Sequence, residues 1–143
     1  MRKIGVILLV LSITFSFCGC NTSDRMIYVD NNKVRLSEPD HTPVITVRTL
    51  LNEINFTLED DSFCDKLSTI INSKTADDKF CYCRGDYQII IDGIYLLYLH
   101  PDKIVVYTDL ETYTGFTVDC SEAETKILYD IIEAEIAQQQ IAD

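Results

Sequence analysis

The sequence is short of the residues from which the commonest catalytic and nucleotide sites are built. Its 143 residues include five glycines and two histidines. So few glycines leave little room for a phosphate-cradling loop, and neither G-x-S-x-G nor H-E-x-x-H occurs. We therefore expect no catalytic residue, no metal and no cofactor, and a protein that is not an enzyme.

Basic residues are scarce as well. Twelve lysines and arginines stand against 23 aspartates and glutamates, which gives a net charge of −11 and a pI near 4.4. Nucleic-acid binding depends on cations that neutralise phosphates, so this composition argues against a nucleic-acid partner. A partner attracted by charge would be a cationic protein, whereas simple solubility is the alternative explanation for the acids.

The longest apolar run extends from Ile4 to Phe17 and is too short for a membrane span. It has 14 residues, whereas a spanning helix needs roughly 20. Arg2 and Lys3 precede the run, and a small residue and a cysteine follow it. This order of charge, apolar run and small residue is typical of a secretory signal.

The end of this segment, Phe17-Cys18-Gly19-Cys20, resembles the lipobox of bacterial lipoproteins. Gly19 is the small residue expected before the cysteine, whereas Phe17 and Cys18 depart from the usual leucine and small residue. The resemblance covers the first 20 residues. It implies that residues 1–19 are removed and that Cys20 carries lipid, such as palmitate. The lipid would anchor the protein in the bacterial cell envelope, outside the cytoplasm. Ordinary signal cleavage and an uncleaved anchor are the alternatives.

The remaining chain suits one domain. Without residues 1–19 it has 10 basic and 23 acidic residues, a net charge of −13. Residues 20–43 are rich in Asn, Asp and Pro, and we interpret them as the lipidated N-terminus and a tether. A short strand at residues 27–29 could dock within this tether. We expect a single domain over residues 44–143.

Two helices are expected from apolar residues at helical spacing. One begins at Asp61 or Ser62, ends near Asn72, and has its apolar positions at Phe63, Leu67, Ile70 and Ile71. The other begins with the capping box Ser121–Glu124 and carries an apolar stripe at Ile127, Leu128, Ile131, Ile132 and Ile136. Residues 47–56 mix strand and helix signals, and we favour a helix there.

Between these helices the apolar period changes to two, which predicts strands. We expect five of them, at residues 80–83, 87–92, 94–100, 103–107 and 113–118. Asp92-Gly93 predicts a two-residue hairpin turn. The expected fold is therefore α+β: a five-stranded antiparallel meander packed by one or two N-terminal helices and a C-terminal helix.

The hairpin register predicts an interaction face. If Asp92 and Gly93 form the turn, Tyr87 pairs with Tyr98, and these tyrosines share a face with His100. Both faces of this hairpin are largely apolar, so each needs a cover. An uncovered face bearing tyrosines would mark an interaction site, whereas helical regions on both faces would leave none.

Four cysteines follow Cys20, and they are candidates for disulfides: Cys64, Cys81, Cys83 and Cys120. An even number in an exported protein predicts two bonds. Cys81 and Cys83 lie two apart on a predicted strand, so a bond between them would be strained. We prefer Cys64–Cys81 with Cys83–Cys120 over the exchanged pairing. The C-x-C spacing matches neither paired zinc knuckles nor a C-x-x-C redox motif.

These observations favour a small lipid-anchored binding or interaction module. An inhibitor or immunity protein directed against a cationic secreted protein is one concrete version. The alternatives are a thiol-dependent enzyme and a structural component of an envelope assembly.

Overall fold

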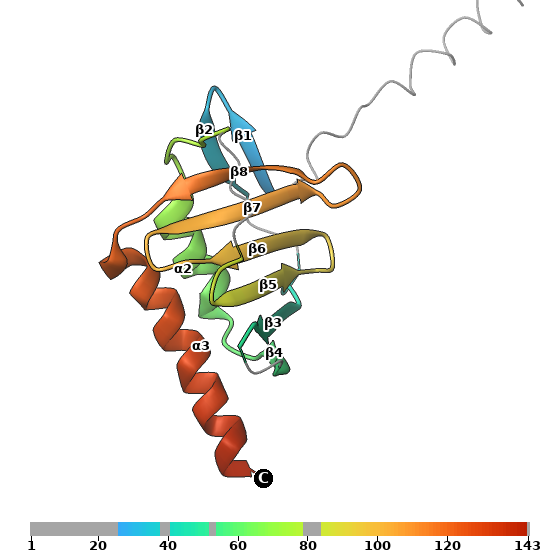
Figure 1. The fold of residues 1–143 in the computed structure, drawn as a ribbon, viewed down its shortest axis with the longest axis vertical. Helices are drawn as coiled ribbons and strands as arrows, with labels where there is room; N and C mark the ends of the chain where they lie inside the picture. The colour runs from blue at the N-terminus through green and yellow to red at the C-terminus, as the bar shows by residue number, and fades with distance from the viewer. Residues whose placement is uncertain (1–25, 38–40, 52–53, 79–83, 143) are drawn as a thin grey trace, which may run out of the picture.

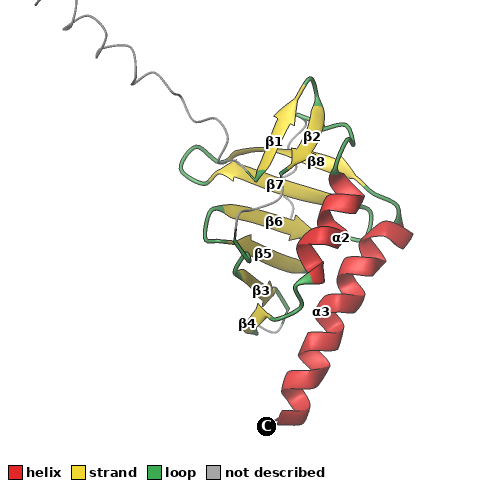
Figure 2. Cartoon of the chain, turned by 180° about the vertical axis from the view of Figure 1, so that it is seen from behind, coloured by secondary structure: helices red, strands yellow, loops and turns green. Residues whose placement is uncertain are grey.

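An antiparallel sheet with two helices on one side forms the body of the protein (Figures 1 and 2). The computed structural model describes residues 26–37, 41–51, 54–78 and 84–142. The helices are α2 (Ser62–Ile71) and α3 (Glu122–Ala142). The strands are β1 (Ile27–Asp30), β2 (Lys33–Leu36), β3 (Ile45–Thr49), β4 (Asn55–Leu58), β5 (Tyr87–Ile91), β6 (Tyr95–Leu99), β7 (Lys103–Asp109) and β8 (Thr114–Asp119). The α+β class is confirmed.

The strands form two sheets and not the single five-stranded sheet that the sequence predicted. β1 and β2 pair with each other, and the other six strands form one sheet in the order β4-β3-β5-β6-β7-β8. Strands β5 to β8 are four of the five predicted strands, in the predicted meander. The fifth, at residues 80–83, lies outside the described residues. β3 and β4 extend the sheet beyond β5 instead.

The helix predicted over residues 47–56 is wrong, because β3 and β4 form a hairpin there. Val47 pairs with Ile89 of β5, and the buried positions of β3 alternate along the strand. β-branched residues such as these favour a pleated, half-buried surface. The helical spacing of Leu50, Leu51 and Ile54 was misleading, since Leu51 is 89% exposed.

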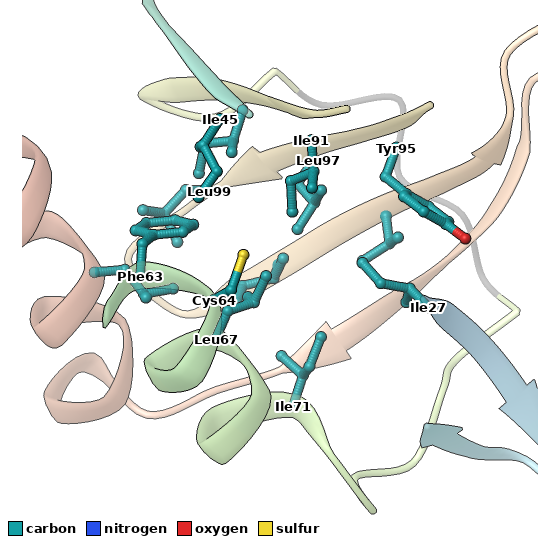
Figure 3. Packing of buried hydrophobic residues seen from close by; sticks show 14 of the residues in the cluster. Ile27, Ile45, Phe63, Cys64, Leu67, Ile71, Ile91, Tyr95, Leu97 and Leu99 are labelled. Carbon is teal, nitrogen blue, oxygen red and sulfur yellow. The ribbon is translucent and has the colours of Figure 1, made fainter. Parts of the chain in front are cut away.

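The core lies between the sheet and α2. The apolar positions predicted for this helix are all buried, and they face Ile45, Ile91, Leu97 and Leu99 on the sheet (Figure 3). Burying one such side chain contributes about 1.5–3 kcal/mol. The helix ends at Ile71 with Asn72 as its C-cap, close to the predicted end near Asn72. Its first turn is held by Asp60, whose carboxylate accepts the Ser62 backbone N–H at 2.8 Å.

The predicted capping box of α3 is confirmed. Ser121 N donates to Glu124 Oε2 at 2.8 Å, and Glu124 N donates to Ser121 Oγ at 3.2 Å. Within the predicted stripe, Leu128 and Ile132 are fully buried, whereas Ile127 is 43% exposed. The last turns of α3 extend past the sheet (Figure 1). Within the described residues, no helix is long and apolar enough to cross a membrane.

The β5–β6 hairpin has the predicted turn and a different register. Asp92 and Gly93 both have positive φ, and Ile94 N donates to Ile91 O at 3.0 Å. The ladder then pairs Ile91 with Tyr95, one residue later than predicted. A slip of one residue exchanges the two faces of a strand. The prediction that Tyr87 and Tyr98 share a face is therefore wrong.

The β1–β2 hairpin belongs to the packed core. The strand expected at residues 27–29 is present, is one residue longer, and has a partner strand. Ile27 and Val34 are buried, and Val34 N donates to Lys74 O at 2.9 Å. The packed part of the chain therefore begins no later than Met26, within the segment expected to be a tether.

Candidate functional site

The two cysteines that the structure describes are free thiols in surroundings that raise their pKa. Cys64 lies in α2 and Cys120 lies between β8 and α3, and both are free. Burial raises the pKa of each to about 11, and nearby carboxylates add to the effect. A thiol nucleophile needs a lowered pKa, so neither has that activation. Cys81, Cys83 and the proposed lipid site Cys20 lie outside the described residues, and the disulfide pairing stays a prediction.

Alkylation of the reduced, folded protein at pH 8 tests these two thiols. With a pKa of about 11, roughly a thousandth of each is thiolate, against roughly a quarter for an ordinary cysteine. From these thiolate fractions we expect Cys64 and Cys120 to react roughly 200-fold more slowly in the folded protein than in the urea-unfolded chain. Peptide mass spectrometry would measure the rate at each position. An equal rate at either position would contradict the raised pKa.

The residues of the predicted interaction face lie apart. Tyr87 lies on the side of the sheet that the helices cover, whereas Tyr98 lies on the other side, with its ring centroid 5.7 Å from that of Tyr107. His100 follows β6, where its backbone N–H donates to Lys103 O at 3.0 Å. Val105, on the same side as Tyr98, is fully buried. On this second side Tyr107 and Thr117 are buried as well, whereas Tyr98 is half-buried.

Metal binding has little support in the part of the chain that the structure describes. No group of three or more His, Cys, Asp or Glu residues there could hold an ion. A four-thiolate zinc site would also need Cys81 and Cys83, which are not described.

A groove with a volume of about 570 Å³ lies between α3 and one end of the sheet. Thr49 at the end of β3 pairs with Tyr87 at the start of β5, so both lie at this end. Tyr129, Glu133 and Ile136 follow one another at helical spacing on α3 and face them. The described residues that line it are Thr49, Leu51, Ile54, Asp86, Tyr87, Tyr129, Glu133, Ile136, Ala137 and Gln140.

A tyrosine–aspartate contact fixes the floor of the groove. Tyr129 OH donates to Asp86 Oδ2 at 2.7 Å, and its ring packs edge-on against Tyr87 with centroids 5.3 Å apart. Asp86 N donates to Leu99 O at 2.9 Å, which ties the loop to β6. Gly85 makes this approach possible, because a Cβ there would lie 2.6 Å from the Leu99 carbonyl carbon.

The groove is acidic and partly apolar. Among the described residues, its lining contains the carboxylates of Asp86 and Glu133 and no cationic side chain. Burial raises the pKa of both Tyr87 and Tyr129, and these same carboxylates raise it further. Leu51 is 89% exposed at the rim. Aromatic rings beside carboxylates suit a cationic side chain with an apolar stem.

Two groove residues were named from the sequence for other reasons, Tyr87 as part of the predicted interaction face and Ile136 as part of the apolar stripe, whereas Asp86, Tyr129 and Glu133 were not predicted as site residues. Arg84-Gly85-Asp86 breaks the predicted strands and matches an integrin-type tripeptide, which arises often by chance, and Glu133 lies on the polar side of the predicted helix. The spacing of Tyr129, Glu133 and Ile136 was the one available signal, since it puts three side chains on one helix face. The contact with Asp86, 43 residues away in the chain, has no local signature.

Comparison of the chain with protein-family models, with curated proteins and with solved structures finds no match in any of the three.

Proposed function

We propose that the protein is a small binding module that holds a cationic, amphipathic segment of a partner protein in the groove beside α3. In this proposal a lipid on Cys20 anchors it to a membrane of the bacterial cell envelope, outside the cytoplasm. The observation that carries the binding role is the lining of the groove, where two carboxylates lie among tyrosine and aliphatic side chains without a cation. Inhibition of, or immunity to, a cationic secreted protein is a concrete form of this role.

The chemistry of the groove supports such a ligand. The stem of a lysine or arginine can lie against the Tyr87 and Tyr129 rings while its charge meets Asp86 or Glu133. Apolar residues of the same segment would cover Ile136 and the exposed Leu51. The net charge of −13 that remains without residues 1–19, from 10 basic and 23 acidic residues, would speed the encounter at low salt. A thiol-dependent enzyme is not favoured, because neither described thiol is activated.

Charge reversal in the groove tests the proposal with a defined probe. The probe is an amphipathic peptide of leucine and lysine, compared with a leucine–glutamate peptide, each titrated into isotopically labelled protein and followed by NMR. We expect only the lysine peptide to shift the groove resonances. An exposed ion pair contributes about 0.2–1 kcal/mol, and the like-charge repulsion that replaces it costs a similar amount, so Glu133→Lys should weaken binding roughly 2- to 30-fold.

Glu135→Lys is the matched control. It makes the same charge change two positions along α3, and Glu135 does not line the groove. Equal loss of affinity in both variants would show that net charge alone attracts the peptide. Shifts confined to another surface would overturn the groove as the site.

A further inference from the structure

Exposed apolar side chains gather at the end of the sheet opposite the groove. β3 and β8 begin there, and the β5–β6 and β7–β8 turns lie there, because neighbouring strands are antiparallel (Figure 1). We call this the turn end. The large apolar residues exposed at it, between 40% and 64%, are Tyr28, Val29, Val44, Ile94, Leu110 and Tyr113.

Two details describe how these side chains are presented. Tyr28 and Val29 of β1 line one hollow of about 550 Å³ together with Ile94 of the β5–β6 turn. Tyr113 is 64% exposed and has φ of 52°, a left-handed conformation that bulky residues rarely adopt. Asp109 holds this turn by accepting the backbone N–H groups of the two residues before Tyr113, at 2.8 and 3.1 Å. The β7–β8 turn therefore presents Tyr113 in a fixed, outward position.

The chain length before the hairpin limits what can cover this surface. Met26 precedes β1, whose residues Ile27 to Val29 line the hollow at the turn end. Only five residues, 21–25, separate Met26 from Cys20. Even a fully extended chain of this length spans at most roughly 20 Å. A lipid on Cys20 would keep the turn end close to the bilayer.

We propose that the turn end lies on the membrane surface, with Ile94 and Tyr113 among the lipid headgroups. This inference rests on the lipid anchor of the proposed function. Tyrosine is suited to the interface, because its ring is apolar and its hydroxyl stays hydrated. The groove lies at the opposite end of the sheet, so this orientation turns it away from the membrane and towards a partner.

Acidic side chains at the turn end determine which headgroup charge this surface can lie against. Asp92 accepts the Val44 N–H at 2.8 Å and lies 3.0 Å from His41, and Asp109 holds the β7–β8 turn. Glu111 is exposed. A surface with these carboxylates is repelled by anionic lipids. The occupant is therefore a zwitterionic bilayer such as phosphatidylcholine.

Single tryptophan substitutions test this orientation. The chain contains no tryptophan, so the introduced residue is the only source of tryptophan fluorescence. We would place one at Tyr113→Trp, one at Ile94→Trp, and a control at Ile141→Trp near the end of α3, where Ile141 is 86% exposed. The mature lipidated variants are bound to phosphatidylcholine vesicles with and without brominated acyl chains. We expect bromine to quench the first two by more than half and the control by less than a tenth.

The possible outcomes distinguish the proposed orientation from the lipid anchor on Cys20, on which it rests. Two turn-end positions guard against one variant that does not fold, which circular dichroism detects. Protein that floats with the vesicles but shows no quenching at either turn-end position overturns the orientation and leaves the anchor. Equal quenching at all three positions also overturns it. Protein that does not float overturns the anchor and the orientation together, whereas peptide binding in the groove is measured independently.

Discussion

Replacement of Leu67 by alanine should lower the free energy of unfolding by about 3 kcal/mol. Leu67 lies in α2, is fully buried, and packs against the middle of the sheet (Figure 3). The substitution removes apolar contacts and leaves a cavity, and both terms are unfavourable. Helix propensity cannot explain a loss, because alanine is the best helix former. Since a domain is stable by about 5–15 kcal/mol, this change removes a large part of the total.

Leu51→Ala is the control, because the chemical change is the same and Leu51 is 89% exposed. It should change the free energy of unfolding by less than about 0.5 kcal/mol. Urea unfolding followed by circular dichroism gives both values. Similar losses in the two variants would mean that α2 does not pack as described. Leu51 lines the groove, so its variant should bind the lysine peptide more weakly while it remains stable.

Replacement of Gly85 by alanine should cost about 3 kcal/mol or more, the upper end of what overpacking causes. The new Cβ would lie 2.6 Å from the Leu99 carbonyl carbon and closer still to its oxygen. These are backbone atoms of β6, so they cannot turn away as a flexible side chain can. The hydrogen bond from Asp86 N to Leu99 O would lengthen, and the floor of the groove would move with it. Affinity for the lysine peptide should therefore fall together with stability.

Gly93→Ala separates this steric effect from the loss of glycine as such. Gly93 has φ of 67° and nothing within 4 Å of an added Cβ. Gly93→Ala should lower the free energy of unfolding by only about 1–2 kcal/mol, the cost of placing a residue with a Cβ in the left-handed region. Urea midpoints of the two variants give the comparison. If Gly93→Ala were the more destabilising, the close contact of Gly85 with β6 would be contradicted.

Local signals predicted the elements that depend on neighbouring residues. The capping box at Ser121 and the apolar spacing of α2 each lie within a few turns of chain, and both are confirmed. The prediction failed for residues 47–56, where the choice between helix and strand depended on β5, about 40 residues away in the chain. For the β5–β6 hairpin, the predicted turn is present and the predicted register is wrong. Asp92-Gly93 specified the turn, but the ladder resumes one residue late, which puts Tyr87 and Tyr98 on opposite faces of the sheet.

The sequence by itself determined the α+β class, the acidic charge and the start of α3, because composition and short-range spacing are properties of the chain. It also supplied the expectation of a lipid on Cys20. The tertiary structure alone decided that β1 and β2 belong to the core and that Asp86, Tyr129 and Glu133 share a groove. Strand pairing and helix packing bring distant residues together to bury apolar surface, and this choice among partners leaves no mark on any one segment.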